Sequence, residues 1–281
     1  MSPFELHQPR SLPEAIALLG GDEAARPMSG GTALMLMMKA GVLRPSRLVC
    51  LNKLELTEIQ VGPDGTLRIG SMVTLRTLEK SDLVRRGWPV IARTLRTLSN
   101  VRVRNVATVG GHLGHGDPHM DLPPVLSALG ASVTVEGPKG RRTVPVERIG
   151  TGYLETSIAQ GELITRLEVP PLGKRRAAYL KCTTRSADDW PALGVAAVLD
   201  LEKNEYSLVI SAATDKPTRL VSTEKLLKGK TADEKLLKQA GEAAVAEVQI
   251  ESDLHGSAAY KQQLLRVYLG RTIHEARKPA G

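Results

Sequence analysis

Ser29-Gly30-Gly31-Thr32 and, about eighty residues later, Thr108-Val109-Gly110-Gly111-His112 are the stretches of this sequence that say most about its fold. Adjacent glycines lack two Cβ atoms, so successive backbone N–H groups can turn toward one point and approach an anion closely. The flanking Ser and Thr residues add hydroxyl donors. Neither stretch has the spacing of a P-loop or of the G-x-G-x-x-G fingerprint. The pair predicts a pyrophosphate site, with two ordinary chain turns as the alternative.

The segment from the end of the second glycine turn to residue 121 contains three histidines and two aspartates: His112, His115, Asp117, His119 and Asp121. Imidazole and carboxylate groups bind metals, but the Gly and Pro residues between them give no helix that would place ligands on one face. We therefore predict no metal here. In a second interpretation Asp121 accepts hydrogen bonds from a bound polyol or ribose and the histidines support the loop. In a third, these are solvated polar residues of a turn.

The length of 281 residues fits one large or two modest domains with a sizeable core. With 42% hydrophobic and 24% charged residues, the composition excludes collagen-like, disordered and disulfide-framework proteins. Two cysteines, Cys50 and Cys182, exclude a four-cysteine zinc site and a cluster ligated by cysteine alone, and permit at most one disulfide. The first residues do not resemble a signal peptide, and no apolar run approaches the roughly 20 residues of a membrane span. A cytoplasmic protein is expected.

The net charge of +8 raises the question of nucleic-acid binding. The densest basic stretches, 102–104, 140–142 and 174–176, are short and interrupted. Aromatic residues make up only 3% of the chain, so few side chains could stack on bases. We predict no nucleic-acid partner, and attribute the charge to an acidic partner or to solubility.

The order of helix and strand signals predicts an α+β fold. Segment 11–20 opens with a Ser cap and ends at a Gly pair, which predicts a short helix. In the first part of the chain we further expect a helix in the apolar run after the first glycine turn, a buried strand at 47–52, hairpins at 59–70 and 133–145, and a helical stretch at about 75–98.

A Pro-rich and then basic stretch at 170–176 is the best candidate for a domain boundary, which we place near residue 175. Beyond it we expect strands at 192–201 and 207–213 joined by a polar turn, and helices at 222–248, broken at Gly229, and at 257–275.

Motifs along nearly the whole chain resemble the FAD-binding medium subunit of the molybdenum hydroxylases, a family that includes bacterial carbon monoxide dehydrogenase and xanthine dehydrogenase. The motifs are Phe4-x-x-x-x-Pro9-x-Ser11-Leu12-x-Glu14-Ala15-x-x-Leu18-Leu19, Gly30-Gly31-Thr32, Ile69-Gly70-Ser71-Met72-Val73-Thr74, Val103-Arg104-Asn105 before the second glycine turn, His115-Gly116-Asp117-Pro118, Asp121-Leu122-Pro123-Pro124, Gly161-Glu162-Leu163-Ile164, 181–189 and 256–261.

The resemblance implies a two-subdomain FAD-binding domain of the PCMH (vanillyl-alcohol-oxidase) type at 1–174, with subdomains of about 1–55 and 56–174. A smaller α+β domain with an antiparallel sheet and helices follows at 175–281. It also implies that both glycine turns hold the FAD pyrophosphate by backbone donors, that Asp121 binds the sugar portion, that Ile164 packs near the flavin, and that Lys181 bonds near the isoalloxazine and tunes it. The implied cofactor-binding residues are Ser29, Gly30, Gly31, Thr32, Ala33, Leu34, Thr108, Val109, Gly110, Gly111, His112, Asp121, Ile164 and Lys181.

By the same resemblance, the chain passes electrons from 2Fe–2S clusters on a small subunit, through FAD, to an external acceptor. A large subunit carries the molybdenum cofactor, and the assembly is a dimer of heterotrimers. His112 stands where relatives often have Asn, and Ala33 replaces a usual polar residue, yet we expect FAD to be retained. The Cys-rich insertion of hydroxybenzoyl-CoA reductases is absent. The alternatives are a self-sufficient FAD-dependent oxidase or reductase, and a basic nucleic-acid-binding or scaffold protein.

Overall fold

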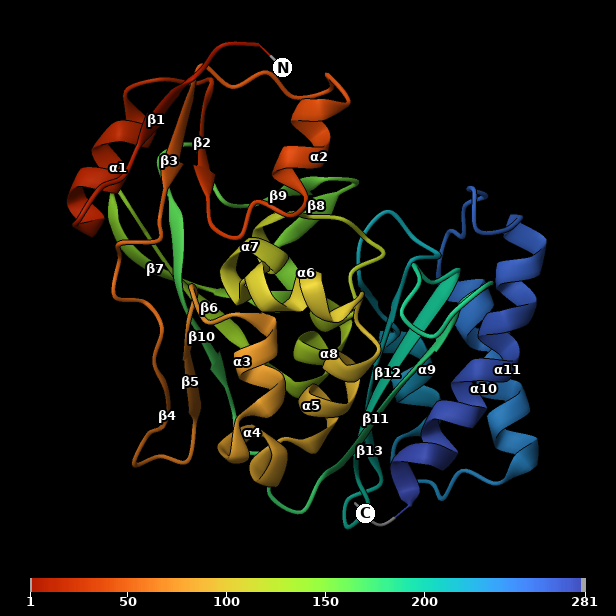
Figure 1. Ribbon diagram of the computed structural model, residues 1–281. Helices are drawn as coiled ribbons and strands as arrows, with labels where there is room; N and C mark the ends of the chain where they lie inside the picture. Colours follow the sequence, from red (N-terminus) through yellow and green to blue (C-terminus); the bar gives the residue numbers. More distant parts are fainter. Residues whose placement is uncertain (1, 279–281) are drawn as a thin grey trace.

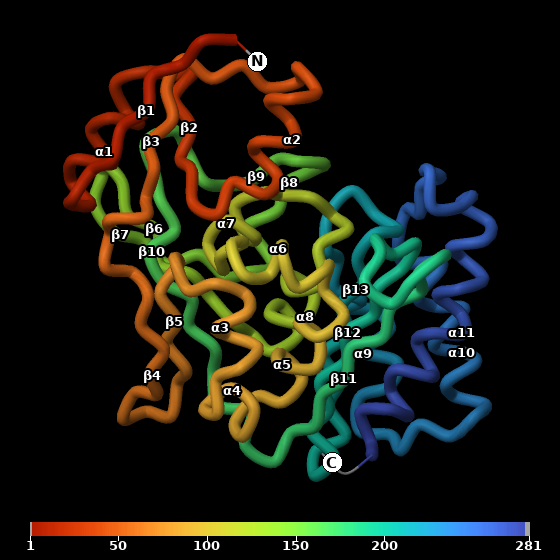
Figure 2. The backbone as a smooth tube through the Cα atoms, viewed as in Figure 1, coloured from red at the N-terminus to blue at the C-terminus, as the bar shows by residue number. Residues whose placement is uncertain are grey.

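In the computed structural model, which describes residues 2–278, three larger sheets follow one another along the chain, and a two-stranded sheet lies within 150–156 (Figure 1). A three-stranded sheet lies within residues 5–50, a five-stranded sheet within 59–169, and a four-stranded sheet within 176–219. Figure 2 traces the chain from the N-terminal sheet through the middle layer to the C-terminal helices. The predicted boundary near residue 175 lies between the last strand of the second sheet and the first strand of the third.

The N-terminal sheet is parallel, in the order β1 (Glu5–His7), β3 (Arg47–Cys50), β2 (Ala25–Met28). Parallel strands require crossover connections, and helix α1 (Leu12–Gly20) lies in the connection from β1 to β2. The Ser11 hydroxyl accepts the backbone N–H of Glu14 at 3.4 Å, so the predicted cap is confirmed. Helix α2 (Leu34–Lys39) follows the first glycine turn, as expected from the apolar run.

The five-stranded sheet is antiparallel throughout, and its order is β4-β5-β10-β6-β7. The predicted hairpins are β4 (Ile59–Val61) with β5 (Leu67–Gly70), and β6 (Ser132–Gly137) with β7 (Gly140–Pro145). Between them lies β10 (Leu163–Val169), which pairs antiparallel with both β5 and β6. The remaining elements of this region are α6 (Val101–Val106), α7 (Val109–Gly114), α8 (Leu122–Leu129), the 3-10 turn η1 (Val146–Arg148), and the strands β8 (Gly150–Gly152) and β9 (Glu155–Thr156).

The stretch predicted as one helical segment at 75–98 is three short helices, α3 (Leu75–Lys80), α4 (Asp82–Gly87) and α5 (Pro89–Arg96). Pro89 disfavours helical backbone at the residue before it, and Trp88 accordingly has φ −138° and ψ 60°. Ser81 is extended, with φ −62° and ψ 122°. The prediction of one segment was wrong because the apolar pattern continues across both breaks.

The C-terminal sheet is antiparallel, in the order β11 (Arg176–Cys182), β12 (Leu193–Asp200), β13 (Glu205–Ser211), β14 (Thr218–Arg219). It lies between α8 on one face and helices α10 (Glu234–Glu247) and α11 (Ala258–Arg277) on the other, with α9 (Val221–Leu227) against β13 (Figure 1). Ala196 and Val198 belong to the core shared with the middle of the molecule, whereas Val195, Ala197 and Leu199 pack under the C-terminal helices. Alternate residues of β12 therefore face the two apolar layers on opposite sides of the sheet.

Both cysteines are free, so no disulfide joins Cys50 to Cys182. Within residues 2–278, no helix combines the length and the apolar character needed to cross a bilayer.

Candidate functional site

The two glycine turns lie in contact, although about eighty residues separate them. A Cβ on Gly30 would overlap the backbone carbonyl of Val106 and lie 2.9 Å from the Cα of Ala107. A Cβ on Gly111 would overlap the hydroxyl of Ser29 and lie 3.1 Å from that of Thr108. The absence of side chains at these positions therefore lets two distant backbone segments form one surface.

The first turn presents backbone donors that nothing else in the described chain uses. Gly31 has φ +68°, a conformation natural to glycine, and the chain turns there into α2. Within residues 2–278, the N–H groups of Gly30, Gly31, Thr32 and Ala33 have no backbone or side-chain acceptor. A run of unsatisfied amides around a glycine turn has the form of an anion-binding nest.

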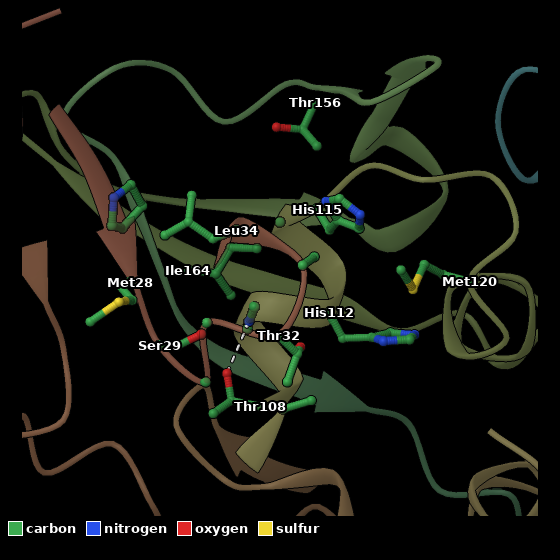
Figure 3. A pocket seen from close by; sticks show the side chains of 18 of the residues that line it. Met28, Ser29, Thr32, Leu34, Thr108, His112, His115, Met120, Thr156 and Ile164 are labelled. Atoms are coloured by element: carbon green, nitrogen blue, oxygen red, sulfur yellow. Dashed lines mark hydrogen bonds between the residues drawn. The ribbon is translucent and has the colours of Figure 1, made fainter. Parts of the chain in front are cut away.

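The second turn differs, because its N–H groups are already bonded inside the protein. The N–H of Val109 donates to the carbonyl of Val73, that of Gly110 to Ser71, and that of His112 to Thr108. The N–H of Gly111 donates to the Thr108 hydroxyl at 3.1 Å, the bond drawn in Figure 3. The expectation that both turns offer backbone donors therefore has to be changed. The second turn contributes close packing and the side chains of Thr108 and His112.

Both turns open onto a cavity of about 730 Å³, a size typical of small-molecule sites. Of the fourteen predicted residues, twelve line it: Ser29, Gly30, Gly31, Thr32, Ala33, Leu34, Thr108, Gly110, Gly111, His112, Asp121 and Ile164. Figure 3 shows Ser29, Thr32 and Thr108 close together, with the ring of His112 on the side of Met120. Most of the residues predicted from sequence motifs therefore lie together on one cavity.

Val109 and Lys181 do not line the cavity. Val109 is fully buried in the core. The Lys181 ammonium donates to Asp121 Oδ2 at 2.9 Å and to the backbone carbonyls of Thr97 and Asp189 at 2.8 and 3.2 Å. All three protons of the ammonium are engaged, so Lys181 lies behind Asp121 and supports it.

Asp121 is a buried carboxylate held from both sides. The Tyr179 hydroxyl donates to Oδ1 at 2.7 Å, and Lys181 donates to Oδ2. Burial raises the pKa of Asp121, opposed by the neighbouring ammonium of Lys181. Burial and the Asp121 charge also raise the pKa of Tyr179 well above its usual value, so this phenol stays protonated and keeps donating. The second lone pair of each Asp121 oxygen is available to a ligand in the cavity.

The histidines after the second turn have different environments. His112 is buried, its Nε2 has no partner among the described residues, and burial together with His115 lowers its pKa to about 3. Burial likewise lowers the pKa of His115. Burial would also lower the pKa of His119, but hydrogen bonds to Asp117 and Asp253 outweigh it and raise that pKa. Within the described part of the chain, no three His, Cys, Asp or Glu residues gather as metal ligands.

A second wall of the cavity was not predicted from the sequence. It comes from 151–160 and from 190–191, and it includes Gln160 and Trp190. The Gln160 side-chain amide donates to the carbonyls of Leu19 and Asp22 at 2.8 and 2.9 Å, which ties this wall to the end of α1. A single Gln in a loop is not part of a recognisable sequence motif. Its role becomes visible only in the structure, where its loop packs against the end of α1.

Comparison with known proteins agrees with this architecture. Residues 2–172 match the family described as the FAD binding domain in molybdopterin dehydrogenase, and residues 178–276 match the CO dehydrogenase flavoprotein C-terminal domain. The glyceraldehyde dehydrogenase medium chain of Sulfolobus acidocaldarius is 31% identical over 276 residues, covering 97% of this chain and 98% of the relative. The carbon monoxide dehydrogenase medium chain of Hydrogenophaga pseudoflava is 32% identical over 279 residues, covering 97% and 96%.

Among solved structures, the reconstituted CO dehydrogenase of Oligotropha carboxidovorans superposes with a TM-score of 0.93 at 31% identity, covering 98% of each chain. The chain therefore belongs to the family of FAD-binding medium subunits of the molybdenum hydroxylases. The predicted family, the predicted α+β fold with its C-terminal sheet-and-helix domain, the FAD-binding domain and the class of oxidoreductase subunit are thereby confirmed.

Proposed function

We propose that this chain binds FAD in the 730 Å³ cavity and acts as the electron-transfer subunit of a heterotrimeric molybdenum hydroxylase or dehydrogenase. The observation that carries the proposal is the row of unsatisfied N–H groups from Gly30 to Ala33 on the cavity wall. Fixed backbone dipoles of this kind bind a pyrophosphate without further ordering of the chain. When bound, FAD supplies a carrier that exchanges one or two electrons.

The other lining residues fit the remaining parts of FAD by their chemistry. The Thr108 hydroxyl accepts from Gly111 and keeps its own proton for donation. Asp121 offers acceptor capacity to sugar hydroxyls, and the apolar side chains of Leu34 and Ile164 suit an aromatic ring. Lys181 acts on this site through Asp121, because its ammonium makes all its bonds to the protein.

The partners of the proposed complex are a large subunit with the molybdenum cofactor and a small subunit with 2Fe–2S clusters, arranged as a dimer of heterotrimers. The division into domains at 1–174 and 175–281, with subdomains near residue 55, also remains our proposal, and the cytoplasmic location stays a prediction. The relatives named above act on different substrates, glyceraldehyde and carbon monoxide.

A self-sufficient flavin enzyme is the less favoured alternative. Such an enzyme needs an acid or base that can reach a substrate over the flavin ring. The two titratable side chains next to Asp121, Tyr179 and Lys181, both donate hydrogen bonds to it. Because these two groups already donate their protons to acceptors within the protein, neither is free to act on a substrate. This supports an electron-transfer role.

The test of FAD binding is the substitution Thr32→Tyr in the chain expressed with its complex. A phenol ring at this turn would fill the space in front of the free amides, so we expect at least a tenfold loss of FAD per polypeptide. Thr231→Tyr, at an exposed position, is the matched control and should retain the cofactor. Full retention of FAD in folded Thr32→Tyr would remove the first turn from the binding site.

A further inference from the structure

The positive charge of the chain is concentrated in one group of helices. Residues 75–106, which form α3 to α6, contain eight of the 38 Lys and Arg residues but only two of the 30 Asp and Glu residues. This segment therefore carries an excess of six positive charges, while the net charge of the whole chain is +8. In Figure 1 these helices lie together on one side of the five-stranded sheet.

The acidic groups of this segment do not neutralise its surface. The two carboxylate oxygens of Glu79 are bound by Arg76 at 2.6 Å and by buried Arg104 at 2.9 Å. Asp82 lies 4.0 Å from Arg85, at an exposed position. Five exposed cations have no carboxylate within 4.0 Å in the part of the chain that is described: Lys80, Arg86, Arg93, Arg96 and Arg102, which we call the basic face.

One end of the basic face lies at the rim of the cavity. Arg102 is exposed on α6, whereas its neighbours Ser99 and Val103 line the cavity. Val101 and Val106, on the same helix, are 45% and 52% exposed, although both are apolar. Exposed apolar side chains on the same helix as an exposed cation are typical of a protein-docking surface. The only aromatic residue of this segment, Trp88, is buried, so no exposed ring is present here to stack on bases.

We propose that the basic face is the docking surface for an acidic face of the 2Fe–2S subunit, an inference that rests on the function proposed above. Electron tunnelling weakens steeply with distance, so a donor protein has to dock beside the cavity that holds the acceptor. Long-range attraction between unpaired surface cations and an acidic partner speeds encounter and orients it. Arg102 meets both requirements, because the next residue, Val103, lines the cavity, and Arg96 precedes the lining residue Leu98 by two positions.

The test measures how fast the full chain associates with the 2Fe–2S subunit prepared from its own complex, as ionic strength increases. Arg96→Glu/Arg102→Glu should lower the association rate constant about tenfold at low salt and flatten its salt dependence. Arg96→Gln/Arg102→Gln should give an intermediate rate. The control Lys235→Glu/Lys238→Glu makes the same charge change on exposed residues of α10 and should leave the rate unchanged.

The outcomes separate this inference from the proposed function. If the native complex contains no iron–sulfur subunit, the proposed function fails and the docking proposal fails with it. If the subunit is present but associates equally fast with the wild type and the Arg96/Arg102 variants, only the docking proposal is overturned. It is also overturned if the basic face binds random duplex DNA in a salt-dependent way that the double Glu variant loses, while subunit association stays the same.

Discussion

The ammonium of Lys181 lies 2.9 Å from the carboxylate of Asp121, and the two side chains are only 7% and 5% exposed. This pair joins β11 of the C-terminal sheet to the start of α8, beside the cavity. Each charge has lost its water and depends on the other, so removing one leaves the other buried without a counterion.

Lys181→Met should therefore destabilise the flavin-free protein by about 3–5 kcal/mol, measured by urea unfolding. The pair of exposed Lys203 and half-buried Asp200, at 3.8 Å, provides the control, and Lys203→Met should cost less than about 0.5 kcal/mol. Equal costs for the two substitutions would mean that the buried pair contributes no more than a surface pair.

His119 should make stability depend on pH. Its ring nitrogens each lie 3.0 Å from a carboxylate, that of Asp117 on one side and that of Asp253 on the other, and Lys261 and His255 lie nearby. Because the pKa of folded His119 is raised, its contribution is complete below the unfolded value of about 6.5 and is lost as pH rises through the folded value. The unfolding free energy of the wild type should fall over this range relative to that of His119→Gln.

The matched control is His274→Gln, which removes an exposed imidazole 3.0 Å from Glu234. Because this imidazole and its carboxylate partner are exposed, His274→Gln should change the unfolding free energy little. A parallel pH dependence in the wild type and His119→Gln would contradict the assignment to His119.

His112 should change the pH dependence of stability in the direction opposite to that of His119. Burial lowers its pKa to about 3, so the folded protein resists protonation at this ring while the unfolded chain accepts a proton near pH 6.5. This group therefore destabilises the fold as pH falls below about 6.5, by up to about 1.4 kcal/mol per pH unit. His112→Asn should reduce the loss of stability between about pH 6.5 and pH 4.5, and NMR should show a neutral His112 ring throughout.

Gly111→Val should abolish FAD retention while the protein stays folded. The new side chain would push into Ser29 and Thr108, where the two glycine turns meet. Gly87→Ala is the control, since nothing lies within 4 Å of a Cβ at that position. FAD content per polypeptide and the far-UV spectrum are the readouts, and stoichiometric FAD in folded Gly111→Val would refute the role of the second turn.

Local features of the fold could be predicted because each has a local cause. The Ser11 cap, the hairpins and the glycine turns depend on residues within a few positions of one another. The breaks at Ser81 and Trp88 were missed because the apolar spacing runs through them. Strand β10 was also missed, since it joins two hairpins that the sequence shows separately.

The candidate site also has parts that could be predicted from the sequence and parts that could not. The glycine turns and Asp121 stood out as motifs, and the structure brings them together. Two backbone N–H groups of the second turn donate hydrogen bonds to the carbonyls of Ser71 and Val73, which belong to another segment. The wall that contains Gln160 likewise exists only after distant segments have packed. Contacts between segments far apart in the sequence produce no characteristic spacing of residues, so these contacts could not be predicted.

The most direct test of FAD binding is the nucleotide released on denaturation from the protein purified with its native complex. We predict a flavin absorption spectrum before denaturation and one FAD per copy of this chain after it, identified by chromatography. A folded, intact complex that releases no flavin, or releases a different nucleotide from this chain, would contradict the account.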